Sequence, residues 1–282
     1  MTASARLLEL AELKIDSFSK DALTAASMVL VDGRNPLRLV FFSVSIRVLL
    51  EHVMGTLAPS DDVENCAWYK KEPERDGPVR SQRIQYWLQG GLTDEFLSSE
   101  LGFDPRPLRS RILRSFNRLS KHVHARQGTL ISDINLQDGE VAPVVDDLVD
   151  LYTAYFEYRS ALIGPLVESL DEQAVGDLMS ETIQSIDEIA THHGIEEIYT
   201  EDTEVVEITS SWVRYRASGS IAVSLQWGSN SDVRRGDGAE MEKSFPFSCD
   251  FVVPTEDPRN LDLAEIASGV DTDSWWSGRY DE

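Results

Sequence analysis

The chain has 282 residues, of which 41 % are hydrophobic and 27 % charged, and this composition suits a folded protein of one or two domains and excludes pervasive disorder. No run approaches the roughly 18 apolar residues of a membrane helix, and the start MTASARLLEL lacks the apolar run of a secretory signal, so we expect a cytoplasmic protein with no membrane partner. The formal net charge of -23 is extreme, and the two cysteines, Cys66 and Cys249, are too few for a disulfide framework or a structural zinc site.

The charge is unevenly distributed along the chain. Residues 1–127 hold 18 basic and 16 acidic residues, whereas the remainder holds 8 basic and 33 acidic residues, a balance of -25. Residues 105–126 carry seven bases and no acid; these are Arg106, Arg109, Arg111, Arg114, Arg118, Lys121 and Arg126. Such a strip attracts a polyanion, but the acidic remainder repels nucleic acid, so any nucleic-acid contact must be local.

Apolar residues at the 3.6-residue period predict that the first part of the chain is helical. The expected helices are one or two over residues 2–30, a core helix ending near Gly55, and helices over 81–90, 93–101, 107–124 and 141–170. Residues 58–80 read as an ordered loop anchored by aromatic side chains, and a second loop is expected at Asp138–Gly139. These elements predict an all-helical bundle over residues 1–172.

The pattern changes in the last third of the chain. One more amphipathic helix is expected over residues 174–193, within a bridging segment 173–195. From about Glu196 the apolar residues alternate with polar ones, which predicts antiparallel strands separated by turns at Ser218–Gly219 and at residues 235–238. We therefore predict an α+β protein in which the helical bundle precedes a small acidic antiparallel β domain, residues 196–282, whose tail carries Trp275 and Trp276 packed back onto it.

The segment FNRLSKHVHAR, residues 116–126, combines one arginine with two histidines on or just beyond a basic helix. Arg118 and His122 are four residues apart and share a helical face, whereas His124 lies about 240° round from Arg118. His124 can therefore approach Arg118 only if the helix ends or kinks, or across a dimer interface. A histidine that moves a proton and an arginine that holds the phosphorane charge suit RNA cleavage by the 2′-hydroxyl, with no metal or other cofactor. The alternative is a solvated basic face with ordinary histidines.

The chain also resembles a known family. An all-α domain with an arginine, four to six residues and a histidine is similar to the HEPN superfamily of metal-independent endoribonucleases, and Arg118 with His124 fits that spacing. The longer segments resemble the predicted PIWI-associated nucleases of prokaryotic defence islands; these segments are RVLLEHVMGTLAP, CAWYK, GPVRSQRIQYWLQGGLTDEF and FNRLSKHVH, with GSIAVSLQWGSNSDVRRGDGAEMEKSFPFSCDF and VDTDSWW in the β domain. One position departs from the superfamily, because Leu119 stands where a polar residue usually follows the arginine. Asn117, directly before the arginine, is the candidate to supply the polar group in its place.

The resemblance implies a composite site at a homodimer interface, in which two copies of the motif meet. Arg118, His122 and His124 are then the catalytic candidates; the candidates for RNA-phosphate contacts are Arg111, Arg114, Lys121 and Arg126. The implied function is that of an endoribonuclease effector of a prokaryotic antiviral or anti-plasmid defence system, with RNA as substrate and a protein partner from the same system bound through the acidic β domain. The rival interpretation is a non-catalytic subunit, in which the bundle serves dimerisation and the acidic domain binds a partner.

Three other features point to structure more than to chemistry. His52, on the predicted core helix, is expected to be a hydrogen-bonded buried histidine. His192 and His193 are expected to lie at a helix end and not to bind a metal. The segment SNSDVRRGDG lacks the ligand spacing of a calcium loop and is expected to be a polar hairpin turn.

Overall fold

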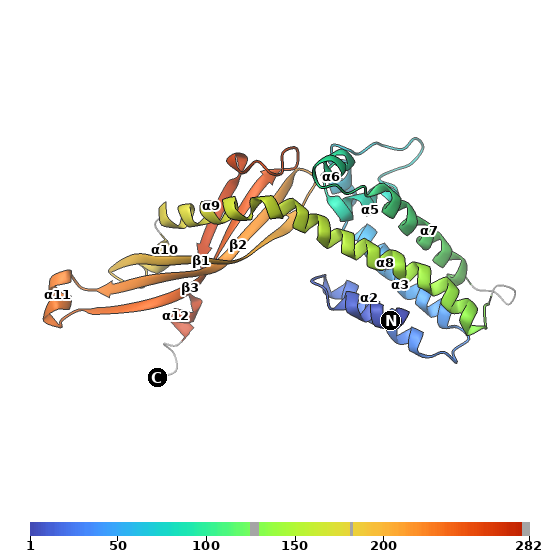
Figure 1. Ribbon diagram of the computed structural model, residues 1–282, viewed down its shortest axis with the longest axis horizontal. Helices are drawn as coiled ribbons and strands as arrows, with labels where there is room; N and C mark the ends of the chain where they lie inside the picture. Colours follow the sequence, from blue (N-terminus) through green and yellow to red (C-terminus); the bar gives the residue numbers. More distant parts are fainter. Residues whose placement is uncertain (125–129, 181–182, 278–282) are drawn as a thin grey trace. The chain divides into compact units, whose positions relative to one another are not determined.

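The chain forms two compact units in the computed structural model, Met1–Tyr158 and Arg159–Glu282, and the model describes residues 1–124, 130–180 and 183–277 (Figure 1). The first unit is helical, and the second contains a four-stranded antiparallel sheet. The predicted order, helices first and an antiparallel sheet second, is therefore confirmed. The candidate phosphate contact Arg126 lies outside the described residues.

The helical unit follows the predicted pattern closely. Its helices are α1 (Ala3–Ala11), α2 (Ser17–Val31), α3 (Arg38–Gly55), α4 (Ser60–Glu64), α5 (Arg80–Gln89), α6 (Asp94–Glu100), α7 (Arg106–Val123) and α8 (Ile134–Ile163), the last of which continues into the second unit. The side chains of Thr2, Asp16 and Thr93 cap α1, α2 and α6 by accepting hydrogen bonds from backbone N–H groups. The loop over 58–80 contains the short α4, and the indole of Trp68 anchors it by donating to the carbonyl of Gly90 at 2.8 Å.

The expected loop at Asp138–Gly139 is wrong, because α8 begins several residues earlier. The carboxylate of Asp133 accepts a hydrogen bond from the backbone N–H of Asn135 at 2.8 Å, which satisfies an orphan donor at the new helix start. The Asp138 side chain then binds the buried guanidinium of Arg38 at 2.8 Å. Tertiary contacts thus extend the helix through a glycine that the sequence pattern treats as a break.

In the second unit, the end of α8 is followed by the 3₁₀ turn Gly164–Leu166, and then α9 (Val167–Ser180) and α10 (Gln184–Asp187) lead to the sheet. Its strands are β1 (His192–Ile208), β2 (Trp212–Trp227), β3 (Ala239–Pro254) and β4 (Glu265–Val270), paired in that order, and α11 (Asn230–Arg235) and α12 (Asp273–Ser277) complete it. The single helix expected over 174–193 is wrong: α9 ends at Ser180, and only the short α10 follows. The polar segment 229–238 connects β2 to β3 as expected, but it contains the short helix α11 before the turn at residues 236–238 (Figure 1).

The expected turn at Ser218–Gly219 is also wrong. Strand β2 runs through both residues, and the first hairpin turns at residues 209–211 instead. A Cβ at Gly219 would come within 1.8 Å of the carbonyl oxygen of Tyr199 on β1. The glycine is required because two backbones approach closely, and not because the chain reverses.

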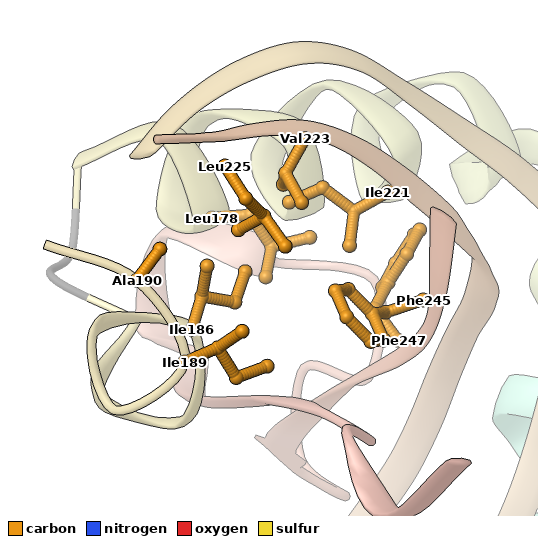
Figure 2. Close-up of a cluster of buried hydrophobic side chains, with 9 residues drawn as sticks. All are labelled: Leu178, Ile186, Ile189, Ala190, Ile221, Val223, Leu225, Phe245 and Phe247. Carbon is orange, nitrogen blue, oxygen red and sulfur yellow. The ribbon is translucent and has the colours of Figure 1, made fainter. Parts of the chain in front are cut away.

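One face of the sheet carries the core of the second unit. Side chains from α9, α10, β2 and β3 meet there with little or no exposure, among them Leu178, Ile186, Val223 and Phe245 (Figure 2). Trp275 packs on Trp227 with ring centroids 5.9 Å apart, which confirms that this part of the tail folds back. In the part of the chain that the structure describes, no helix has both the length and the apolarity to cross a membrane.

Candidate active site

Helix α7 carries the basic strip, and its apolar stripe fixes which way the strip faces. Leu108, Ile112, Phe116 and Leu119 are buried at the 3.6-residue period, so the bases lie on the remaining surface. Pro107 occupies the first turn, where a missing N–H costs no hydrogen bond. Leu119, the residue that departs from the superfamily pattern, is 1 % exposed and belongs to the core, whereas Asn117 is exposed.

The first two catalytic candidates converge on one carboxylate. Arg118 Nε lies 3.7 Å from Glu140 Oε2, and His122 Nε2 lies 3.4 Å from the same oxygen. The Arg118 and Glu140 side chains are 41 % and 35 % exposed, and that of His122 is 13 % exposed. A cation, an imidazole and a carboxylate therefore share one solvent-accessible position between α7 and α8.

The third catalytic candidate, His124, is not part of this cluster within one chain. Helix α7 ends at Val123, and His124 has left the helical path with φ -102° and ψ 41°. Its side chain is exposed, and among the described residues no hydrogen bond or ion pair joins it to Arg118. The structure thus meets the condition that the helix ends before His124, but it does not bring this histidine to the arginine.

The candidate phosphate contacts divide into two groups. Arg111 is already engaged, because its guanidinium lies 2.6 Å from Asp150 and 3.6 Å from Asp147, both on α8. Arg114 and Lys121 are exposed and form no ion pair within the described part of the chain. Because they lie four residues before and three after Arg118, they share its helical face.

Acidic residues of α8 pair with two bases of the strip, Arg111 and Arg118, and the sequence reasoning missed them. Ser115 donates to Asp147 at 2.5 Å, and the pairs of Arg111 with Asp150 and of His122 with Glu140 align the two helices in antiparallel register. Glu140, Asp147 and Asp150 recur at helical spacing, so they lie on one face of α8. This spacing is the sequence signal that could have identified them as partners of the bases on α7. The strip is consequently less positive than its sequence suggests.

A partly buried ion pair holds the first half of α7 to α6. Arg109 donates to both carboxylate oxygens of Asp94 at 2.6 Å and to the side chain of Gln89 at 3.0 Å. Burial raises the pKa of the Asp94 carboxyl, but the hydrogen bonds from Arg109 and Gln89 outweigh it, so that this pKa lies below its ordinary value. Arg109 therefore positions the helix and is not available to a ligand.

An open pocket of about 460 Å³ lies beside the first half of α7. Arg111 lines it together with the carboxylates of Asp104, Asp150 and Glu157, so its walls disfavour a phosphate. Arg118 and His122 are not among its lining residues, which places the candidate site farther along the α7–α8 surface.

Two of the remaining histidines, His52 and His193, have structural partners, and His192 and His193 begin strand β1 and do not lie at a helix end as expected. His52 Nε2 lies 3.0 Å from Asp16 Oδ1, and its ring lies 4.4 Å from that of Phe18, which confirms the expected hydrogen-bonded histidine. His193 Nδ1 lies 2.9 Å from the Asp187 carboxylate in the second unit. Over residues 1–124, 130–180 and 183–277, no three His, Cys, Asp or Glu side chains form a group that could hold a metal ion.

Two family models cover nearly the whole chain. Both are described as predicted pPIWI-associating nuclease, and they match residues 10–150 and 155–276. The gap between them falls close to Tyr158, where the first compact unit ends. No curated protein and no solved structure matches the chain.

Proposed function

The chain belongs to the family of predicted pPIWI-associating nucleases, and from this premise we propose that it is a HEPN-like, metal-independent endoribonuclease whose site is built on Arg118, His122 and His124. The observation that carries the proposal is the convergence of Arg118 and His122 on Glu140 at a solvent-accessible position. We further propose that it acts as a homodimer in the cytoplasm, as an effector of a prokaryotic antiviral defence system.

Each group of the cluster has a role in cleavage of RNA by its own 2′-hydroxyl. His122 takes the 2′-hydroxyl proton while the 2′-oxygen attacks phosphorus, and the bond from phosphorus to the 5′-oxygen breaks. The products are a 2′,3′-cyclic phosphate and a 5′-hydroxyl, whose proton comes from His124 of a second copy. The Arg118 guanidinium holds the charge that develops on the phosphorane oxygens.

Glu140 is a positioning residue in this scheme. At 3.4 Å from Nε2 it orients the His122 ring, so that the other ring nitrogen is the one that takes the 2′-hydroxyl proton. Its contact with Arg118, at 3.7 Å, is longer than a charge-assisted hydrogen bond, so an incoming phosphate can replace it. Arg114 and Lys121 then contact neighbouring phosphates on the same face, without selecting a base sequence.

The test is cleavage of a structured RNA in the presence of EDTA. Arg118→Ala, His122→Ala and His124→Ala should each lower the cleavage rate by about 10²-fold or more, since each removes a proton-transfer or charge-stabilising group. The matched control is His193→Ala, which removes a histidine of similar burial that also pairs with a carboxylate, but in the other unit. Cleavage that requires a divalent cation, or that survives loss of His122, would refute the mechanism.

One observation favours the rival function, a non-catalytic subunit. Arg118 pairs with an acid of its own chain, which the rival interpretation expects, although His124 is exposed and does not pack among apolar residues. In that case the acidic second unit binds a protein partner from the same defence system through complementary charge. The two functions diverge in the same assay: a partner-binding subunit shows no cleavage, and affinity purification from the native host recovers a stable partner.

A further inference from the structure

Helix α3 has a second apolar face, on the side away from its own core. Leu39, Phe42, Ile46, Leu49 and Val53 are buried and pack inside the helical unit. On the other side, Leu37, at the start of the helix, and Phe41, Val44 and Val48 within it are each between 40 % and 45 % exposed. We refer to these four residues as the α3 seam.

The spacing of the α3 seam is that of a helix-packing surface. Its members are separated by four, three and four residues, which is the alternating step of a heptad seam. Single apolar residues scattered on a surface need no explanation, but four at this spacing form a continuous stripe along three turns. A stripe of this kind is buried when another helix packs along it.

We propose that the α3 seam is the surface through which two copies of this chain associate, with the two α3 helices antiparallel. The seam is complementary to itself when it is reversed about the point between Phe42 and Ser43. Leu37 then lies opposite Val48 of the second copy, and Phe41 lies opposite Val44, so every apolar residue meets another. A two-fold axis at this point makes the contact isologous and closes the dimer.

Charges beyond the seam favour the same antiparallel register. Arg34, in the turn before α3, is exposed, and Glu51, one turn beyond Val48, has a side chain that is 54 % exposed and lies 3.8 Å from Arg47 and 3.9 Å from Arg80 of its own chain. In the antiparallel register Arg34 of each copy lies at the same end of the interface as Glu51 of the other, whose contacts with its own arginines are longer than charge-assisted hydrogen bonds. A parallel pair would instead set like charges side by side, which disfavours that alternative.

The antiparallel register also fixes the spacing of the two α7 ends along α3. His122 contacts Glu140 on α8, and Arg38 binds Asp138 on the same helix, so α7 ends at the level where α3 begins. That level lies roughly 7 Å along α3 from the two-fold point, at 1.5 Å per residue. In the dimer the two α7 ends are therefore roughly 14 Å apart along the α3 direction; that His124 of one copy serves the site of the other rests on the proposed function.

The first test is sedimentation velocity of the full chain and two variants. The wild type should be a dimer, and Val44→Glu should weaken association roughly 100-fold, because the charge enters the interface twice. The matched control Met179→Glu changes an apolar residue that is 66 % exposed on α9 and should leave the dimer intact. A monomeric wild type, as expected if the second unit or another protein covers the seam, would overturn the proposal, as would a Val44→Glu variant that stays dimeric.

The second test uses cysteine cross-linking, which needs no disruptive charge. Cys66 and Cys249 are both buried, so an introduced cysteine is the reactive thiol. In the antiparallel register the two copies of Val44 are offset by roughly 4.5 Å along the helix, whereas the two copies of Gly55 are roughly 38 Å apart. Val44→Cys should therefore cross-link with a short bismaleimide, and Gly55→Cys should not. Cross-linking at Gly55, or none at Val44, contradicts the proposed register.

Failure of the dimer and failure of the nuclease are distinguishable. Both tests are carried out without RNA and can be repeated on Arg118→Ala, which should remain a dimer. A dimer with no cleavage retains the interface and refutes the activity, whereas cleavage by a monomer refutes the interface and the role of the second copy's His124 but leaves the cleavage activity standing.

Discussion

Replacing Asp94 by Asn should loosen α7 from the helical unit, because it leaves the Arg109 guanidinium without its counter-charge. The Arg109 side chain is only 12 % exposed, and it donates to both oxygens of Asp94 at 2.6 Å. Asparagine keeps the shape of the side chain but supplies one acceptor oxygen and no charge. The substitution therefore isolates the cost of an uncompensated, mostly buried cation.

The magnitude follows from the burial of the two partners. Removing one partner of a fully buried pair costs about 3–5 kcal/mol, whereas exposed pairs contribute about 0–1 kcal/mol. Because the Asp94 side chain retains 28 % of its exposure, solvent screening reduces the cost, and we expect about 2 kcal/mol. With a urea dependence of about 2 kcal/mol per molar, the midpoint of the helical unit should fall by about 1 M.

The chain offers a closely matched control in Asp104→Asn. Asp104 also binds an arginine in bidentate fashion, Arg106 at 2.7 and 2.9 Å, but both side chains are exposed, at 43 % and 65 %. This variant should leave the midpoint unchanged. The measurement is hydrogen exchange in peptides of α7 at increasing urea concentration, because it reports on the unfolding of the helical unit alone.

The contribution of the Arg109–Asp94 pair to the free energy of unfolding depends on pH, and the lowered pKa of Asp94 gives the sign. The pKa of Asp94 is lower in the folded protein than in the unfolded chain, so its contribution to stability is present above the unfolded value, about 3.9, and is lost as the pH falls through the folded value. The difference between wild type and Asp94→Asn should be constant above about pH 5 and shrink below pH 3.9. Equal midpoint shifts for Asp94→Asn and Asp104→Asn, or a difference that grows in acid, would refute the reasoning.

Two further predictions concern the sheet and the thiols. Gly219→Ala should destabilise the second unit by about 1–3 kcal/mol, since the new methyl group meets the Tyr199 carbonyl, while Gly269→Ala, with open space around its Cβ, should be neutral; thermal unfolding compares the two. Burial raises the pKa of the Cys66 and Cys249 thiols to about 12, so neither should react with iodoacetamide at pH 8 until the protein unfolds, and mass spectrometry of the labelled protein checks this.

The helices were predictable because their signals are local. The apolar stripe of α7 and the cap at Thr93 depend on residues within two turns, and the structure confirms both. The start of α8 was not predictable, because Asp138 is held in a helix by Arg38, one hundred residues away in the chain. No window of the sequence shows which distant side chain will stabilise a weak helical segment.

The candidate site shows the same division. Its residue types and their spacing pointed to Arg118, His122 and His124, and the end of α7 before His124 fits the stated condition. The partners of the cations, however, depend on which helix packs against α7. Glu140 and Asp150 are unremarkable acids in the sequence, yet they engage Arg118, His122 and Arg111 once α8 lies antiparallel to α7.

By itself, the sequence determined that helices precede an antiparallel sheet, the face that α7 buries and the acidic character of the second half, because periodicity and charge are properties of neighbouring residues. Only the tertiary structure decided that Gly219 lies inside a strand, that much of the basic strip is neutralised and that the α3 seam is left uncovered by the helical unit. Each of these outcomes depends on how segments that are far apart in the chain approach one another. Close approach of backbones, pairing of charges and burial of side chains together establish those distances.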